Sequence, residues 1–203
     1  LLTKNFPDNQ DVKKNAIKKL TDFICSFDYF SFSNYLENLL LASANNYSLF
    51  AKEDIQFALQ IELKIITFCL QIKSHLKIFE YFSCQLLSRN IGLNEESFHL
   101  SLETLINYGL ELQLDKKFEK KELLLQLLDL YDSLDFKTFT IDLSLLGFYS
   151  DRQVVPKLFK ILEKVIKNSH NLKPLNTKKF EEDLFFFLTT YSTQFISIYG
   201  SSV

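Results

Sequence analysis

Residues that break helices are scarce in this sequence. Its 203 residues include only four Gly and three Pro, and so few breakers favour long helices joined by short connections. It also lacks any sustained stretch in which Val, Ile and Thr alternate with polar residues, so a β-sheet is not expected. We therefore predict an all-α protein, from a chain long enough to bury a substantial core.

Cysteine is also scarce, and its spacing follows no disulfide or metal-binding pattern. Cys25, Cys69 and Cys84 are far apart, and each stands among apolar residues. A disulfide framework or a C-x-x-C zinc knuckle would need cysteines grouped in pairs. We expect three buried thiols in a reducing intracellular compartment, the nucleus or the cytoplasm.

Methionine is absent throughout, including at position 1. This is unusual in a Leu-rich chain, and we expect a fragment of a longer protein. The alternative is that modified methionines are missing from the sequence. The first residues do not have the layout of a signal peptide.

The chain has no overall excess of positive charge. Its net charge is −2, whereas a nucleic-acid-binding domain is typically basic. The charge is uneven, however: residues 151–180 carry a net charge of +6 and residues 1–20 one of +3, which leaves −11 for the remainder. Such segregation is more common on the solvent faces of amphipathic helices than at functional patches.

Motifs of catalysis and metal binding are absent. His75, His99 and His170 lie in separate regions, and none has a partner at a spacing that would place two metal ligands on one helix face. There is no Gly-x-Ser-x-Gly elbow and no Gly-rich phosphate loop. We therefore predict a non-enzymatic protein with no catalytic, cofactor-binding or metal-binding residues.

One acidic cluster could suggest a divalent cation. Asp129, Asp132 and Asp135 follow one another at three-residue steps. Each step advances about 300° around a helix, so the three carboxylates drift apart. Hard cations usually take convergent oxygens from a loop. We interpret this cluster as a hydrated acidic helix face.

Hydrophobic periodicity predicts about nine helices. Residues 184–203 form a stretch without a charged residue but with many Ser and Thr. It is too polar for a transmembrane span, so we expect a packing helix and no membrane span. The nine expected helices are 11–25, 33–44, 52–72, 75–89, one from 94 to beyond 108, one from about 122 to about 134, 139–149, 155–167, and one from 178 towards 191 or beyond.

One apolar stripe recurs with a period of 41 residues. The stretch "FTIDLSLLGFY" at 139–149 matches "FHLSLETLINY" at 98–108 and "FEEDLFFFLTTY" at 180–191. In each copy Phe is followed by Leu four residues on and by a large apolar residue seven residues on, which is one face of a helix. Repeats of 98–138, 139–179 and 180–203 (partial) would each form a helical hairpin. Hairpins that stack form an α-solenoid, and a plain helical bundle is the alternative.

The stretch "DVKKNAIKKL" at 11–20 resembles the second helix of a HEAT repeat. Asp11, Val12, Lys13, Ala16 and Leu20 stand at the positions that this family favours, with Lys where Arg is preferred. The 41-residue period also suits HEAT or armadillo repeats. The resemblance implies an α-solenoid that acts as a scaffold.

Two other stretches are similar to the end of a pentatricopeptide repeat, namely "LFKILEKVIKNSHNLKPLN" at 158–176 and "IFEYFSCQLLSRNIGLNEESF" at 78–98. That family binds single-stranded RNA, and the resemblance implies an organellar, for example mitochondrial, RNA-binding module. The repeat here is about six residues longer than that family's unit, and the chain is not basic overall.

The clearest candidate site is a basic ridge. Lys157, Lys160, Lys164 and Lys167 recur on one side of a predicted helix, and its other side is apolar. Lys173, Lys178 and Lys179 could extend the ridge. Such a ridge attracts phosphates or an acidic partner, and its alternative is an ordinary solvent face.

These patterns together predict a single helical-repeat domain over 1–203, a superhelix of stacked antiparallel hairpins. Its expected role is that of a non-enzymatic scaffold or adaptor that binds protein partners within a multisubunit complex. The alternative is the RNA-binding module, which would act in RNA processing or translation.

Overall fold

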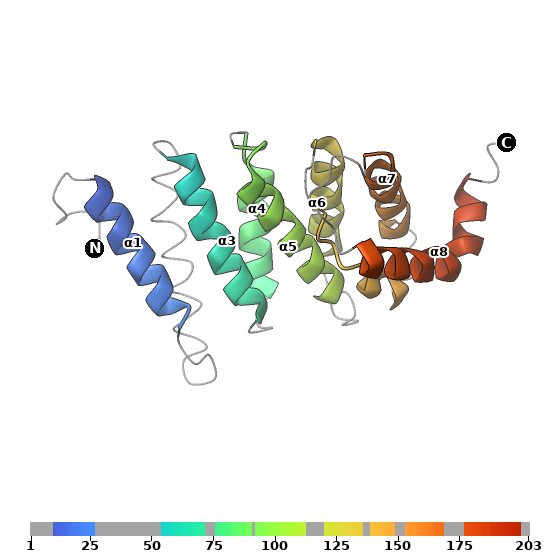
Figure 1. Cartoon of the computed structure of the whole chain (residues 1–203), viewed down its shortest axis with the longest axis horizontal. Coiled ribbons are helices and arrows are strands. Elements are labelled where there is room, and N and C mark those ends of the chain that lie inside the picture. Colours follow the sequence, from blue (N-terminus) through green and yellow to red (C-terminus); the bar gives the residue numbers. More distant parts are fainter. Residues whose placement is uncertain are drawn as a thin grey trace. The chain divides into compact units, whose positions relative to one another are not determined.

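The computed structural model describes residues 10–26, 54–71, 76–90, 92–112, 120–135, 139–148, 153–168 and 177–199. These residues form seven α-helices and one 3-10 helix, and none of them forms a strand (Figure 1). The predicted all-α class is therefore confirmed. The helix expected at 33–44 lies outside the described residues, and the total of nine helices is not confirmed.

The chain divides into two compact units, Leu1–Ile78 and Phe79–Val203. In the first unit, α1 (Gln10–Ile24) packs beside α3 (Ile55–Gln71). Lys14 pairs with Asp54, and the later Lys64 pairs with the later Asp22, so the two helices run parallel. The buried side chains of these two helices include Ile24, Ala58, Leu59 and Ile65.

Asp54 explains where α3 begins. Its Oδ1 accepts the backbone N–H of Phe57 at 3.0 Å, which is the hydrogen bond of a helix N-cap. Its Oδ2 lies 2.5 Å from the Lys14 ammonium. The hydrogen bond from Lys14, together with the Phe57 N–H, holds the pKa of the Asp54 carboxyl below its usual value of 3.8.

We expect Asp54→Ala to lower the stability of this unit by about 1 kcal/mol, the typical cost of a lost N-cap. Because the pKa of Asp54 is lower in the folded chain, its contribution is present above pH 3.8 and is lost as the pH falls through the folded value. Urea unfolding at pH 7 and pH 3 measures both effects. Asp54→Asn is the control, since it keeps the capping oxygen and should cost less at pH 7. A loss for Asp54→Ala that is equal at both pH values would contradict this account.

The second unit contains five further α-helices and the 3-10 helix. They are α4 (Leu76–Leu87), α5 (Glu96–Leu112), α6 (Lys121–Ser133), η3 (Leu143–Phe148), α7 (Val154–Lys167) and α8 (Thr177–Tyr199); α4 begins just before the boundary between the units. Gly92, between α4 and α5, has a φ of 71°, a left-handed conformation that favours glycine.

The helices α5 and α6 form an antiparallel hairpin. Glu103 of α5 contacts Tyr131 near the end of α6, whereas Gly109, later in α5, faces Leu124 near the start of α6. A Cβ atom on Gly109 would lie 2.9 Å from Leu124 Cδ1 and 3.2 Å from the Phe79 ring. Glycine thus allows α4, α5 and α6 to approach closely at this point.

The helix predicted at 139–149 is wrong. Residues 139–142 are not helical, residues 143–148 form the 3-10 helix η3, and Tyr149 lies outside the described residues. The side chain of Asn107 in α5 bonds the backbone of this segment on both sides. Its Nδ2 donates to the Thr140 carbonyl at 2.9 Å, and its Oδ1 accepts the Asp142 N–H at 2.8 Å. These backbone groups are therefore satisfied outside a helix, and η3 starts after Asp142, whose Oδ1 accepts the Ser144 N–H at 3.0 Å.

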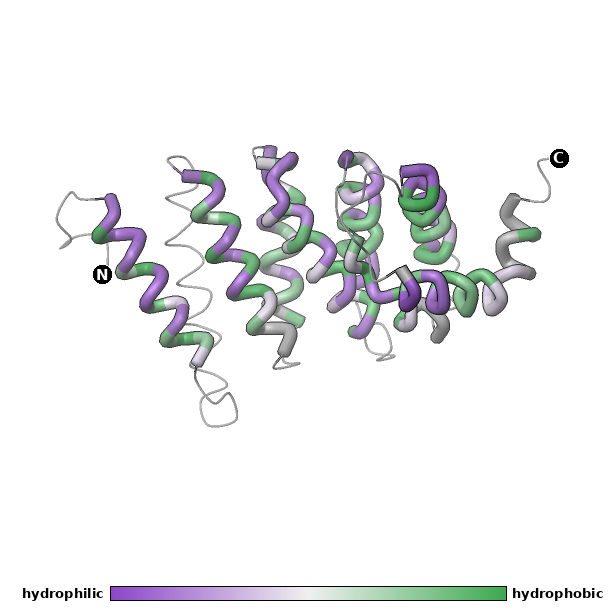
Figure 2. Tube along the Cα trace, viewed as in Figure 1, coloured by the Kyte–Doolittle hydropathy of each residue, from purple (hydrophilic) through white to green (hydrophobic). Residues whose placement is uncertain are grey.

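The helix α8 packs through one side of its first half. Phe187 is fully buried, and its ring centroid lies 4.9 Å from that of Phe159 in α7 and 5.0 Å from that of Tyr191. Phe180 meets Phe139 edge to face, with ring centroids 5.7 Å apart. Figure 2 shows the first turns of α8 as hydrophilic and the following turns as hydrophobic.

The cysteines only partly match the prediction of buried thiols. Cys84 is exposed, Cys25 is half-buried, and both are free thiols. The prediction is wrong for Cys84, because α4 turns this position away from its packed side. Burial raises the pKa of the Cys25 thiol to about 11, opposed by the positive charge of Lys64. The side chain of Cys69 is not among those described.

Candidate interaction surfaces around α6, α7 and α8

The basic ridge of α7 packs against the acidic face of α6. Lys157 forms an ion pair with Asp129, and Lys160 Nζ lies 2.5 Å from Asp132 Oδ2. In both pairs the lysine follows its partner by 28 residues, so α6 and α7 run parallel. Two patterns that the sequence shows separately thus form one cross-helix ladder.

Lys164 contacts the end of α6 rather than a carboxylate. Its Nζ donates to the backbone carbonyls of Asp132 at 2.8 Å and of Leu134 at 2.6 Å. The last carbonyls of a helix have no partner within the helix and carry its partial negative charge. The Lys164 ammonium therefore stabilises the C-terminus of α6.

We expect Lys164→Met to destabilise α6 by about 1 kcal/mol, since it removes the ammonium but keeps most of the aliphatic stem. Hydrogen exchange of the α6 amides measures this loss. Lys167→Met is the matched control: Lys167 pairs with Glu163 of its own helix at 2.6 Å, an exposed (i, i+4) pair that contributes about 0.3–0.5 kcal/mol. Equal effects of the two substitutions would contradict the role given to Lys164.

The remaining lysines of the predicted ridge come after the end of α7. Lys173 lies outside the described residues, and Lys178 and Lys179 are exposed in the first turn of α8. Lys179 belongs to a cavity described below. Asp135, the third member of the acidic cluster, is exposed beyond the end of α6. Whether the ridge binds a partner stays a prediction.

A buried polar network lies inside the second unit, and no sequence pattern predicted it. Glu103 is fully buried in α5. Its Oε1 accepts the Tyr131 hydroxyl at 2.6 Å, and its Oε2 accepts the Thr140 hydroxyl at 2.6 Å. Burial, and then the nearby Glu103, raise the pKa of Tyr131 far above its usual value. The network ties α5, α6 and the 139–142 segment together.

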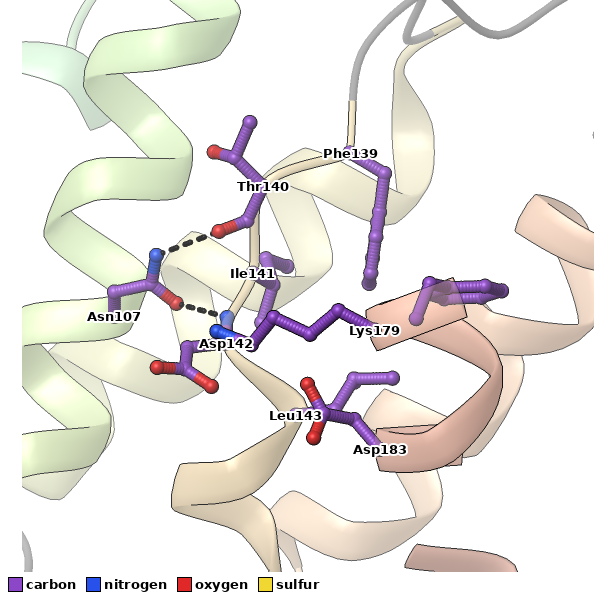
Figure 3. A pocket seen from close by; sticks show the side chains of 9 residues that line it. Asn107, Phe139, Thr140, Ile141, Asp142, Leu143, Lys179 and Asp183 are labelled. Atoms are coloured by element: carbon purple, nitrogen blue, oxygen red, sulfur yellow. Dashed lines mark hydrogen bonds between the residues drawn. The ribbon is translucent and has the colours of Figure 1, made fainter. Parts of the chain in front are cut away.

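A cavity of about 330 Å³ lies beside this segment. Figure 3 shows how its walls come from three elements: Asn107 from α5, Phe139 to Leu143 from the segment before η3, and Lys179 and Asp183 from the start of α8. Phe180 also lines it. Asp142 accepts both the N–H and the hydroxyl of Ser144 on Oδ1, so its Oδ2 is not used by this turn.

The outer side of α8 is apolar and exposed. The exposed fractions are 71% for Phe185, 50% for Phe186, 40% for Leu188 and 66% for Ile196. Leu188 lies about 60° from Phe185 around the helix and Phe186 about 100° from it on the other flank, and Ile196 lies in the last turns, after the bend of α8 that Figure 1 shows. We refer to Phe185, Phe186, Leu188 and Ile196 as the outer α8 face.

Hydroxyl groups between these side chains are satisfied by α8 itself. Thr189 Oγ1 donates to the carbonyls of Phe185 and Phe186, both at 2.9 Å, and Thr190 Oγ1 donates to that of Phe186 at 2.8 Å. Ser192 Oγ donates to the Thr189 carbonyl at 3.2 Å. A partner that covers this face therefore need not supply hydrogen bonds to them.

Of the three histidines, only His99 lies among the described residues. His99 is buried, and its Nε2 lies 2.7 Å from the Leu93 carbonyl oxygen, as in a structural hydrogen bond. Within the described ranges no three His, Cys, Asp or Glu side chains are grouped to hold a metal ion. None of the helices in these ranges is long and apolar enough to cross a membrane.

No protein-family model, curated protein or solved structure matches this chain significantly.

Proposed function

We propose that this chain is a non-enzymatic scaffold that binds another protein through the outer α8 face. The observation that carries the proposal is the gathering of Phe185, Phe186, Leu188 and Ile196 at exposed positions of one helix. Single exposed apolar residues are common on proteins, but bulky apolar side chains gathered on one face usually mark an interaction site. Aromatic residues are enriched at such sites.

The occupant that fits this face is a helix of a partner protein with an uncharged, apolar side. Residues 184–203 contain no charged side chain, and the nearest exposed charges on the helix, Glu181 and Glu182, lie one turn before Phe185 and Phe186. The hydroxyls of Thr189, Thr190 and Ser192 already bond to carbonyls of α8. Burial of this face therefore gains apolar contact and leaves few polar groups unsatisfied.

The order of helices in the second unit supports the predicted solenoid. Here α5 and α6 run antiparallel, as in a hairpin, whereas α6 and α7 run parallel. Stacked hairpins have this property, because equivalent helices of consecutive hairpins point the same way. The HEAT resemblance of residues 11–20 favours the same architecture, and these residues lie in α1.

The RNA-binding alternative stays a prediction, and no contact among the described residues favours it. An RNA phosphate at Lys157 or Lys160 would compete with Asp129 or Asp132, which already pair with these lysines. A tight RNA complex whose affinity falls steeply with salt, measured by filter binding, would support the alternative over the scaffold.

The proposal is tested by the substitution Phe185→Asp in the full chain. We expect it to abolish co-purification of the partner from the native cell, because a charge would be buried against an apolar helix. Phe23→Asp is the matched control, since Phe23 in α1 is also an exposed phenyl ring (59% exposed) but has no such neighbours in the described part of its helix. Retention of the partner by Phe185→Asp, or equal loss with Phe23→Asp, would overturn the proposal.

A second copy of this chain could cover the outer α8 face instead of a partner protein, and the two cases must be distinguished. Sedimentation of the purified chain over a range of concentrations shows whether a second copy covers the outer α8 face. A dimer that Phe185→Asp dissociates would replace the partner helix with a second copy and would contradict the proposed occupant. Binding to neutral lipid vesicles that Phe185→Asp abolishes would likewise contradict a protein partner.

A further inference from the structure

The cavity between α5, the 139–143 segment and α8 is partly open to solvent and has both apolar and polar lining groups. Ligand sites commonly enclose about 300–1,000 Å³ and combine apolar walls with a few placed polar groups. The volume of about 330 Å³ is near the lower end of that range, which suits one side chain or a small molecule. The apolar lining residues are Phe139, Ile141, Leu143 and Phe180.

The charges of the cavity favour a cation. Asp142 and Asp183 contribute two carboxylates and Lys179 one ammonium, so the charged lining groups sum to −1. Asp183 is half-buried and points from α8 towards the cavity (Figure 3). A half-buried carboxylate is screened less by solvent than an exposed one, so it attracts a bound cation more strongly.

The aromatic walls favour a planar cation. Phe139 and Phe180 meet edge to face, with ring centroids 5.7 Å apart, and both line the cavity. A guanidinium group stacks on aromatic faces and pairs with carboxylates through two parallel N–H bonds. An ammonium group has neither the planar face nor the fork of donors.

We propose that this cavity binds a guanidinium group on an aliphatic stem. The stem lies on the apolar walls, and the guanidinium donates to Asp183 and to Oδ2 of Asp142. The source is either an arginine side chain of a polypeptide or a free arginine-like metabolite. The site does not depend on the outer α8 face, because Asp183 and Phe185 are two residues apart and lie about 200° apart around the helix.

The test is an NMR titration of the ¹⁵N-labelled full chain with N-acetyl-arginine methylamide. We expect saturable shifts of the amides at 139–143 and 179–183, with a dissociation constant in the millimolar range or below. The citrulline counterpart, which has nearly the same shape without the charge, should bind at least about tenfold more weakly. Free arginine as a second probe separates the two sources: it binds more weakly if the site takes a residue within a chain, and as tightly or more so if it takes the metabolite.

Two substitutions are expected to change the affinity for the arginine probe in opposite directions. Asp183→Asn should weaken binding about fivefold, because it removes one carboxylate without changing shape. Lys179→Gln should tighten it about twofold to fivefold, because it removes the positive charge that repels the ligand. Glu181→Gln is the matched control, since Glu181 is exposed on the same helix and is not a lining residue, and the affinity should stay within about twofold.

Three results would overturn the assignment. The first is the absence of saturable shifts at these amides up to about 50 mM probe, where a millimolar complex is nearly saturated. The second is equal binding of the arginine and citrulline probes. The third is tighter binding of the N-acetyl-glutamate methylamide, with Lys179→Gln weakening it, which would make the cavity an anion site. Spectra of each free variant that match the wild type outside the cavity exclude misfolding as the cause.

Discussion

Replacing Glu103 with alanine is expected to lower the stability of the second unit by about 3 kcal/mol. The substitution leaves the Tyr131 hydroxyl in the interior without its acceptor and removes the hydrogen bond to Thr140, both at 2.6 Å in the folded chain. An unsatisfied buried group costs about 1–3 kcal/mol, and the cavity left by the side chain adds to this loss. The buried network is therefore the site at which one substitution should cost most among the polar groups described.

Hydrogen exchange of the α5 and α6 amides is the suitable measurement, because a chain of two units need not unfold in one step. Glu103→Gln is the control. It keeps the shape and one acceptor oxygen, so we expect it to lose about half as much stability as Glu103→Ala. The backbone amide of Asp142 should exchange faster in Glu103→Ala. Glu103 bonds Thr140 and so helps to hold the segment in which the Asp142 N–H donates to Asn107. A loss below about 0.5 kcal/mol for Glu103→Ala would show that the network is not structural.

Phe187→Ala is expected to destabilise α8 by about 3–5 kcal/mol, whereas Phe185→Ala should change its stability by less than about 0.5 kcal/mol. Both residues are Phe in the same helix, two positions apart. Phe187 is fully buried between the rings of Phe159 and Tyr191, and Phe185 belongs to the outer α8 face. The difference follows from which side of α8 packs on the unit.

Thermal unfolding and exchange of the α8 amides measure this pair of substitutions. Phe186→Ala serves as a second control, because Phe186 is half-exposed and should also lose little. If Phe185→Ala cost as much stability as Phe187→Ala, the outer α8 face would be part of the core, and it would not be available to a partner. If neither substitution lowered the stability, Phe187 of α8 would not pack against Phe159 of α7 as described.

Strong local patterns were enough to predict most helices of this chain. The helix expected at 155–167 is observed as Val154–Lys167, because its apolar side chains repeat regularly and fill the packed side of α7. Three apolar stripes spaced by 41 residues suggested three similar helices. Two of the stripes do lie in α-helices, α5 and α8.

The helix prediction at 139–149 was wrong because residues distant in the sequence determine the structure of this segment. The groups that hold residues 139–142 are Asn107 and Glu103, which precede the residues they bond by 33 to 37 positions. Side-chain bonds to the backbone of the segment replace the helical ones. The carboxylate of Glu103, which stands within the apolar run of α5, is the local feature that indicates a buried polar group.

The candidate sites show the same limit. The lysines of α7 and the aspartates of α6 were each predicted, but sequence periodicity does not say which helices are neighbours, so their pairing was not. Of the charged groups in the cavity, only Lys179 belongs to the basic ridge that the sequence predicts. Asp142 and Asp183 come from different elements, which are brought together by the fold. The outer α8 face was expected to pack, and its exposure appears only in the structure.

Site-specific photo-crosslinking tests the central claim most directly. A photoreactive phenylalanine analogue is placed at Phe185 and, as the control, at Glu163, an exposed position of α7. We predict that position 185 crosslinks in the native cell to a helix of one other protein, at apolar residues without nearby charges, and that position 163 does not. Crosslinks from 185 to a second copy of this chain, to a charged surface or to RNA, or equal yields from both positions, would contradict the account.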